Sequence, residues 1–294
     1  MTPDVITNMK GGVATRSTLV MALGLALVGA LPAEARTTPV PATTTKTTPK
    51  TPVKKPKLEV KRDTVAGGDH FRIVTPHGPV HVWRPPGYRY ATAGTLVYVH
   101  GHGSSPDEAW QNYNLPAQFR ASKQNALFIV AGAQRDSSDS IKWEALGELL
   151  KTVSRGIGAQ RPNGRVVVMG HSGAFKTIEK WLDYTPLDHI ILLDALFGGI
   201  EEYKAWLETA KGHAENKLTL VATAGRTLDN SKVFVKGLKG VVTAEEVPAK
   251  FEDFTKKQRT ARVLFVKAQF GHMELVTGKK AMPILLRRTP LLPL

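Results

Sequence analysis

The sequence of 294 residues contains no cysteine. This absence excludes disulfide bonds, thiolate metal sites, a cysteine nucleophile and a lipoprotein anchor. Acidic residues are also scarce, with 25 Asp and Glu against 40 Lys and Arg, so the formal net charge is +15. Such an excess of positive charge favours anionic partners. The sequence has no phosphate-binding loop, dinucleotide fingerprint or nucleic-acid-binding module, however, and we predict no nucleic-acid partner.

The first 35 residues have the features of a secretory signal peptide. Lys10 and Arg16 supply positive charge, and residues 17–31 form an apolar stretch that is short for a transmembrane helix. The sequence Ala-Glu-Ala at 33–35 fits a cleavage site with small residues on both sides. We therefore expect export to the periplasm, the envelope or the medium. An uncleaved membrane anchor is the alternative.

Residues 36–62 are rich in Thr, Pro and Lys and have almost no apolar side chains. Such a segment buries too little surface to offset the entropy of ordering, which predicts a disordered, basic linker. Its positive charge favours contact with an anionic envelope polymer. An equal alternative is that the segment is only a solvated tether. The lysines concerned are Lys46, Lys50, Lys54, Lys55, Lys57 and Lys61. One folded domain is predicted to follow, from residue 63 to residue 294.

Short apolar runs alternate with segments of helical periodicity along this domain. This alternation predicts an α/β fold, with a mainly parallel sheet that has helices on both faces and an antiparallel hairpin at its start. Strands are expected at 71–75, 80–83, 95–99, 126–131, 165–169, 189–193, 218–224 and 262–267, and helices at 106–122, 138–157, 175–182 and 201–210.

The segment Gly170-His171-Ser172-Gly173-Ala174 lies between a predicted buried strand and a predicted helix. It resembles the G-x-S-x-G nucleophile elbow of the α/β-hydrolases, with Ala174 where a glycine is usual. A sharp turn of this kind exposes the serine and requires small neighbours, because the strand and the helix pass close together. The alternative is that Ser172 is an ordinary turn residue at the start of a helix.

The resemblance implies a base and an acid that follow the serine in the order acid, then histidine. His272 comes directly after the last predicted strand, whereas His213 leads into a strand and is expected at the opposite end of the sheet. Two acids compete. Asp194 follows the strand after the elbow, and Asp229 follows the next strand; we favour Asp194 because functional residues gather at the carboxyl ends of strands.

An oxyanion hole needs backbone N–H groups directed at the developing charge. The resemblance implies Gly173 as one donor, and His102 or Gly103, in the loop after residue 99, as the other. We interpret His100 as a core histidine that shapes this loop. His100 and His102 also have the spacing of a zinc pair, but the next acidic residue is Asp107, so no metal site is predicted.

Trp143 is a weak candidate for a substrate contact, since an aromatic residue near a helix is more often part of the core. Taken together, the resemblance from residue 63 onwards implies an exported serine hydrolase without a cofactor. It would cleave the ester bond of a small or envelope-derived substrate through an acyl-enzyme, with Ser172, His272 and Asp194 as its triad. A cell-envelope amidase or peptidase, and a non-catalytic envelope-binding protein on a hydrolase scaffold, are the alternatives.

Overall fold

The computed structural model describes residues 57–209 and 216–294. These residues build one sheet with the strand order β1-β2-β3-β5-β4-β6-β7-β8-β10-β9. The strands are β1 (Val60–Val65), β2 (Gly68–Ile73), β3 (Val80–Arg84), β4 (Gly94–Val99), β5 (Ala126–Ala131), β6 (Val166–His171), β7 (Leu187–Leu193), β8 (Lys217–Ala222), β9 (Val241–Ala244) and β10 (Val263–Lys267).

The first three strands are antiparallel to their neighbours, and the remaining pairs are parallel. The predicted fold class is therefore confirmed. Strands β4, β5 and β6 are buried along their whole length, as expected for continuous apolar runs in a parallel sheet covered on both faces.

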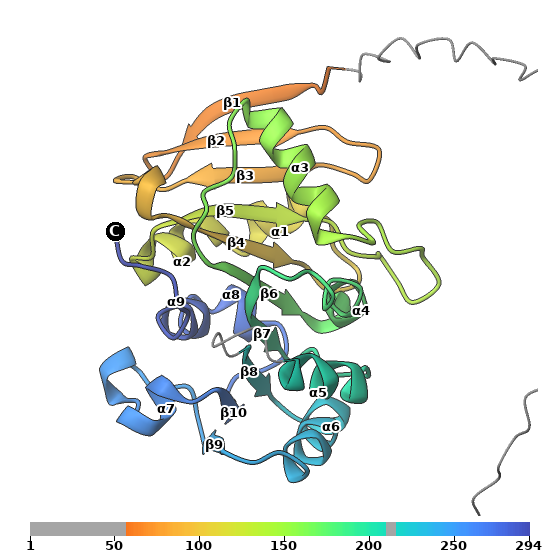
Figure 1. Cartoon of the computed structure of the whole chain (residues 1–294), viewed down its shortest axis with the longest axis vertical. Helices are drawn as coiled ribbons and strands as arrows, with labels where there is room; N and C mark the ends of the chain where they lie inside the picture. The colour runs from red at the N-terminus through yellow and green to blue at the C-terminus, as the bar shows by residue number, and fades with distance from the viewer. Residues whose placement is uncertain (1–56, 210–215) are drawn as a thin grey trace, which may run out of the picture. The chain divides into compact units, whose positions relative to one another are not determined.

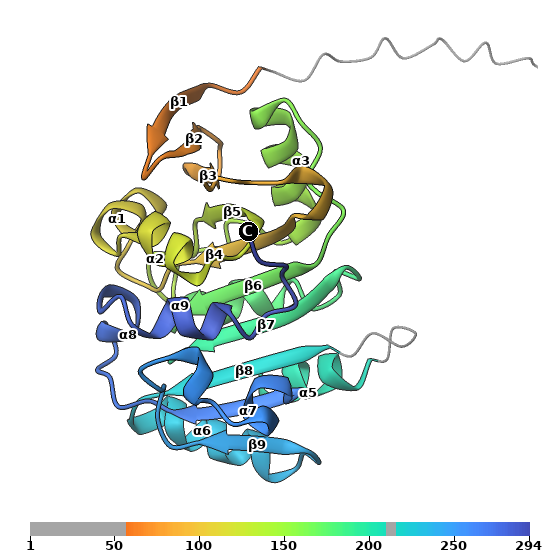
Figure 2. The same ribbon diagram turned by 90° about the vertical axis from the view of Figure 1, so that its left-hand side faces the viewer.

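Helices cover both faces of the sheet (Figures 1 and 2). One hydrophobic cluster contains side chains of α3, α4, α5 and α6, and the other contains side chains of α1, α2, α8 and α9. The helices are α1 (Pro106–Asn112), α2 (Leu115–Ser122), α3 (Leu146–Ile157), α4 (Phe175–Glu179), α5 (Ile200–Glu208), α6 (Gly225–Lys236), α7 (Lys256–Thr260), α8 (Glu274–Thr277) and α9 (Ala281–Leu286), with short 3-10 turns η1 (Tyr90–Thr92), η2 (Ser172–Ala174) and η3 (Phe251–Asp253).

Some predicted elements differ from those observed. The helix expected over 106–122 is interrupted at Asn114, which has a left-handed backbone (φ 51°), and α2 restarts with Pro116 in its first turn. Residues 138–145 are not helical, because the carboxylate of Asp136 accepts the N–H groups of Ser138 and Asp139 and closes a turn. Strands β1 and β9 and helices α6, α7, α8 and α9 were not predicted.

The N-terminal predictions fall largely outside the described residues. Residues 1–35 and the linker as far as residue 56 belong to this undescribed part. The structure corrects the end of the linker, because strand β1 begins at Val60 rather than after residue 62. All the described residues belong to one compact unit, Lys55–Leu294. Within residues 57–209 and 216–294, no helix has the length and apolar character needed to span a membrane.

A row of hydrogen-bonded side chains joins the antiparallel strands to helix α1. Asp63 on β1 lies 2.6 Å from His70 Nδ1 on β2, and His70 Nε2 lies 2.9 Å from His81 Nδ1 on β3. His81 Nε2 in turn lies 2.8 Å from Asp107, which also accepts two hydrogen bonds from Arg72. Asp107 stands in the first turn of α1, so this row connects the first strand of the domain to the helix that follows residues 100–103, His-Gly-His-Gly, here called the His-Gly loop.

Candidate active site

Ser172 stands at the end of strand β6, where the chain turns into η2 and α4. Its backbone is left-handed, with φ 53°, a conformation that costs a non-glycine residue on the order of 1–3 kcal/mol. Gly170 permits the close packing of α4, because a Cβ added there would lie 2.3 Å from Cδ1 of Ile178 and 3.0 Å from Cβ of Ala174. The segment thus has the backbone of a nucleophile elbow, and Ala174 fits in place of the usual glycine.

His272 and Asp194 meet at the same edge of the sheet. His272 lies in the loop after β10, and its Nδ1 donates a hydrogen bond to Oδ2 of Asp194 at 2.6 Å. Asp194 follows β7 and has a left-handed backbone, with φ 45°. The carboxyl ends of β6, β7, β8 and β10 lie in register, which brings the loops that follow them together.

Asp194 is held as a carboxylate by hydrogen-bond donors on both oxygens. The N–H and hydroxyl of Thr223 donate to it at 3.0 and 2.8 Å, and the hydroxyl of Thr227 donates to Oδ1. Burial alone would raise the pKa of Asp194, but the hydrogen bonds from His272, Thr227 and Thr223 outweigh it and lower the pKa to about 2. The carboxylate therefore fixes the His272 proton on Nδ1, and Nε2 of the neutral ring is left to accept a proton.

The other candidates for the acid and the base, Asp229 and His213, are not part of this arrangement. Asp229 is on α6 rather than in a loop; its side chain is 73% exposed and lies 3.8 Å from Nζ of Lys232. The structure therefore pairs Asp194, not Asp229, with His272. His213 lies in residues 210–215, outside the described part of the chain.

The His-Gly loop after β4 packs against the elbow. A Cβ added to Gly101 would lie 2.7 Å from Cβ of Ser172. His100 is buried and uses both ring nitrogens: Nε2 accepts the N–H of Ala133 at 3.1 Å, and Nδ1 donates to the carbonyl of Gly101 at 2.7 Å. Burial lowers the pKa of His100. This histidine shapes the loop and has no free nitrogen for a metal ion.

Of the predicted oxyanion donors on this loop, Gly103 is not available. Its N–H donates to the carbonyl of Arg135 at 2.6 Å, so the prediction of Gly103 as a donor is corrected. His102 N–H remains as the candidate on the loop. Gly173 remains the candidate on the elbow, because it stands in the first turn of a helix, where N–H groups have no partner within the helix.

The imidazole of His102 lies directly over Gly173. A Cβ added to Gly173 would lie 2.2 Å from Cδ2 and 2.4 Å from Nε2 of His102. Burial lowers the pKa of His102, and the positive charge of Lys176 adds to this effect. Gly173 is thus required by contact with the His-Gly loop, whereas from the sequence we expected both glycines to serve the packing of strand on helix.

Trp143 is a core residue rather than a site residue. Its side chain is buried in the cluster that includes α3, its ring lies 4.6 Å from that of His77, and its carbonyl accepts the indole N–H of Trp181. It lines a cavity of about 1130 Å³ that Ser172, Asp194 and His272 do not border. The prediction of Trp143 as a substrate contact is therefore not supported.

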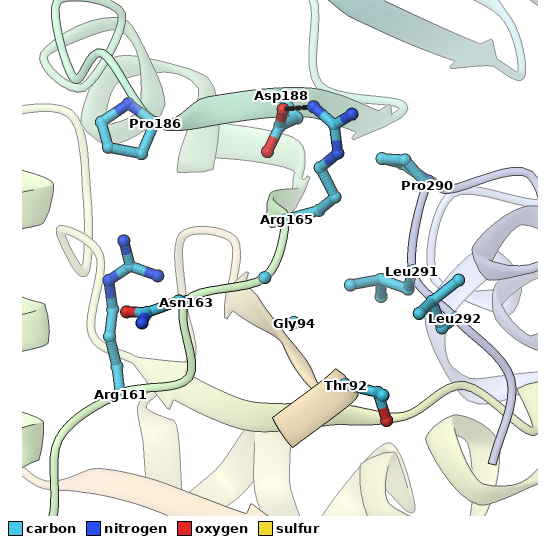
Figure 3. A pocket seen from close by; sticks show the side chains of 11 residues that line it. Thr92, Gly94, Arg161, Asn163, Arg165, Pro186, Asp188, Pro290, Leu291 and Leu292 are labelled. Carbon is cyan, nitrogen blue, oxygen red and sulfur yellow. Dashed lines mark hydrogen bonds and ion pairs between the residues drawn. The ribbon is translucent and has the colours of Figure 1, made fainter. Parts of the chain in front are cut away.

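A second cavity, of about 630 Å³, lies at the opposite end of the sheet (Figure 3). It is lined by residues at or near the amino ends of strands, including Gly94 and Asp188, and by Leu291 near the C-terminus. Figure 3 shows Arg165 directed at Asp188, with which it forms an ion pair at 2.7 Å. This cavity is separate from the candidate active site.

Two parts of the site were not predicted from the sequence. Thr223 and Thr227, which hold Asp194, lie at and beyond the end of β8, where the sequence shows no helix start of the expected kind. His171 was noted only as a variable position of the elbow motif, yet its ring contacts His272. Within the described residues, no group of three or more His, Asp and Glu side chains is arranged to hold a metal ion.

Comparison with known proteins identifies the fold. The sequence matches no protein-family model and no curated protein. Among solved structures, S-formylglutathione hydrolase from Agrobacterium tumefaciens is 9% identical, with a TM-score of 0.50 over 78% of this chain and 98% of that chain.

Two further solved structures are more distant. The feruloyl esterase module from Clostridium thermocellum is 12% identical, with a TM-score of 0.49 over 78% of this chain and 88% of that chain. Dienelactone hydrolase from Anabaena variabilis is 13% identical, with a TM-score of 0.41 over 80% and 96%. At 9% identity, the likeness to S-formylglutathione hydrolase shows the fold alone: this chain has the α/β-hydrolase fold.

Proposed function

We propose that this α/β-hydrolase-fold protein is a serine hydrolase that cleaves a carboxylic ester through an acyl-enzyme. Ser172 is the nucleophile, His272 the general base and Asp194 the residue that orients the base. The observation that carries the proposal is the 2.6 Å hydrogen bond from His272 to Asp194, at the edge of the sheet where Ser172 occupies a left-handed turn.

The reaction begins when Ser172 Oγ attacks the carbonyl carbon of the ester and Nε2 of His272 takes the hydroxyl proton. The ionised Asp194 holds the imidazole in the correct tautomer and stabilises the imidazolium that forms. The N–H groups of Gly173 and His102 donate to the oxyanion of the tetrahedral intermediate.

The intermediate collapses when the C–O bond to the alcohol breaks and His272 gives its proton to the leaving oxygen. Water then attacks the acyl-enzyme, with His272 again accepting a proton. The second tetrahedral intermediate releases the carboxylic acid, and the proton returns to Ser172. Each step uses groups of this chain and water alone.

Replacement of Ser172 by Ala tests the proposal. We expect turnover of a short activated ester to fall at least about a thousandfold, since the nucleophile is lost while binding groups remain. Covalent labelling by a fluorophosphonate should disappear, and far-UV circular dichroism should be unchanged. Full activity in the folded variant would contradict the assignment of Ser172. A matched amide of the same acyl group distinguishes an esterase from an amidase.

Export and envelope contact complete the proposal. The signal-like residues 1–35 and the basic segment after them support a mature protein that starts at Arg36 outside the cytoplasm. N-terminal sequencing of the secreted protein should find Arg36, and a chain that still starts at Met1 would contradict export by cleavage. Deletion of residues 36–56 should weaken sedimentation with isolated envelopes at low salt and leave ester turnover unchanged. Equal sedimentation would leave the segment as a spacer only.

A further inference from the structure

We propose that His171, the residue before the nucleophile, is a positioning residue that holds the backbone of His272 in place for catalysis. The proposal rests on the serine hydrolase function proposed above. It assigns a role to a side chain that lies between the nucleophile segment, the base and the His-Gly loop and that touches no substrate in the mechanism described.

The contact is a single directed hydrogen bond. Nε2 of His171 lies 3.0 Å from the backbone carbonyl oxygen of His272, and the two rings lie 4.4 Å apart, tilted by 38°. A carbonyl oxygen can only accept, so Nε2 of His171 carries the proton and donates it. The two residues are 101 positions apart in the sequence, and this bond joins the end of β6 to the loop after β10.

His171 is neutral at neutral pH. Burial lowers its pKa to about 4, and the neighbouring His272 adds to this effect. The ring thus has one proton, which the hydrogen bond places on Nε2, and Nδ1 has a lone pair. Nδ1 is buried and has no hydrogen-bond partner among the described residues.

An unpartnered buried nitrogen destabilises the fold, and an apolar side chain of similar shape would avoid this cost. What an imidazole adds at this position is therefore the Nε2–H donor. Within residues 57–209 and 216–294, this donor is used in the hydrogen bond to the carbonyl of His272.

The backbone on either side of His272 is held by α8, whose N–H groups donate to the carbonyls of Gly271 and Met273, and His171 adds a contact at the carbonyl of His272 itself. A separate contact holds the ring of His272. Its side chain is 39% exposed, and Nδ1 is fixed by Asp194. One contact at Nδ1 sets the tautomer but allows the ring to pivot about that atom. The bond from His171 fixes the backbone of His272, and the two contacts together determine where Nε2 points.

The position of His171 makes the support specific to the reaction. His171 precedes Ser172 directly, so the bond ties the backbone of the base to the peptide that holds the nucleophile. The same ring also borders the His-Gly loop, since a Cβ added to Gly101 would lie 3.1 Å from Nδ1 of His171. A displacement of about 1 Å between reacting groups can cost about a hundredfold in rate.

Three substitutions separate the hydrogen bond from the volume of the ring. His171→Gln places an amide N–H at about the reach of the imidazole Nε2, whereas His171→Asn is one carbon shorter and cannot reach the carbonyl of His272. His171→Leu removes the donor altogether. Gln and Asn are both polar amides, so they form a matched pair if the Leu variant folds poorly.

We expect kcat on a short ester to fall about 10–100-fold in the Asn and Leu variants, with KM changed less than about threefold, and Gln to recover most of the loss. The rate of fluorophosphonate labelling should follow kcat, because it reports the alignment of Ser172 and His272. Thermal unfolding and circular dichroism identify variants that have simply lost their fold.

Folded Asn and Leu variants that keep kcat within twofold of the wild type would overturn the proposal. A folded Gln variant as slow as the Asn variant would overturn it too, because the donor would then be irrelevant. Failure of the serine hydrolase function is distinguishable from both results, since it appears as full activity in Ser172→Ala.

Discussion

Replacement of Asp194 by Asn keeps the shape of the side chain and turns one oxygen into an NH₂ donor. Oδ1 accepts from the N–H of Thr223 and the hydroxyl of Thr227, and Oδ2 accepts from the hydroxyl of Thr223 and from His272. The backbone N–H of Thr223 can only donate, so the new NH₂ group must take the Oδ2 position. There the Thr223 hydroxyl can rotate to accept, but His272 can accept only if its proton moves from Nδ1 to Nε2.

An imidazole with its proton on Nε2 cannot remove the proton of Ser172. In serine proteases the corresponding change lowers kcat about 10⁴-fold, which is equivalent to about 5 kcal/mol of transition-state stabilisation. We expect a loss of this size for Asp194→Asn on a short activated ester. KM should change by less than about threefold, because Asp194 is buried behind His272 and does not contact the substrate.

Asp229→Asn is the matched control. Asp229 is 73% exposed on α6 and has only a weak ion pair, so kcat should stay within about twofold of the wild type. Initial rates of both variants, measured on protein with native circular dichroism, give the comparison. Near wild-type activity in Asp194→Asn would refute the tautomer argument, and an inactive Asp229→Asn would move the acid to α6.

Two further outcomes are expected from the same site. Gly173→Ala should destabilise the fold by about 1–3 kcal/mol, because its Cβ would lie 2.2 Å from the His102 ring. The double variant with His102→Ala should regain most of this loss in thermal unfolding, and strictly additive effects would contradict the contact. The pKa of Asp194 is about 2 in the folded protein and 3.8 in the unfolded chain. Its ionisation should therefore add about 2 kcal/mol to the free energy of unfolding. This contribution is present above about pH 4 and is lost as the pH falls toward 2. Urea unfolding across this pH range measures the effect. If the unfolding free energy of Asp194→Asn changed with pH as steeply as that of the wild type, the result would count against this contribution.

The central strands could be predicted because their residues are buried on both faces. Residues 95–99 and 126–131 are continuous apolar runs, and both lie in fully buried strands. Strand β1 was missed because it lies at the edge of the sheet, where charged side chains such as Lys61 and Arg62 stay exposed. Helix α6 was missed because polar residues, Thr227 and Ser231, are buried against the sheet and break the apolar periodicity.

The residues of the candidate site could be predicted where the order of strands along the chain determines their position. The rule that functional residues gather at the carboxyl ends of parallel strands selected Asp194 and His272, which the structure brings together. Contacts between loops were not accessible in this way. The bond that occupies Gly103 depends on the backbone of Arg135, and nothing in either segment indicates that they meet.

The row from Asp63 through His70 and His81 to Asp107 has a consequence for strand β1. It contains three hydrogen-bonded contacts, and each contact needs one proton. The contacts differ in their exposure to water, because the side chain of His81 is buried whereas that of Asp63 is largely exposed.

His81 is the ring that stays singly protonated, because burial and the neighbouring His70 lower its pKa to about 4. At the other end of the row, the Asp63 side chain is 64% exposed to water. The side-chain contact between β1 and β2 at Asp63 is therefore the one that water can replace. The row thus ties β2 and β3 to α1, whereas strand β1 depends mainly on its backbone pairing with β2.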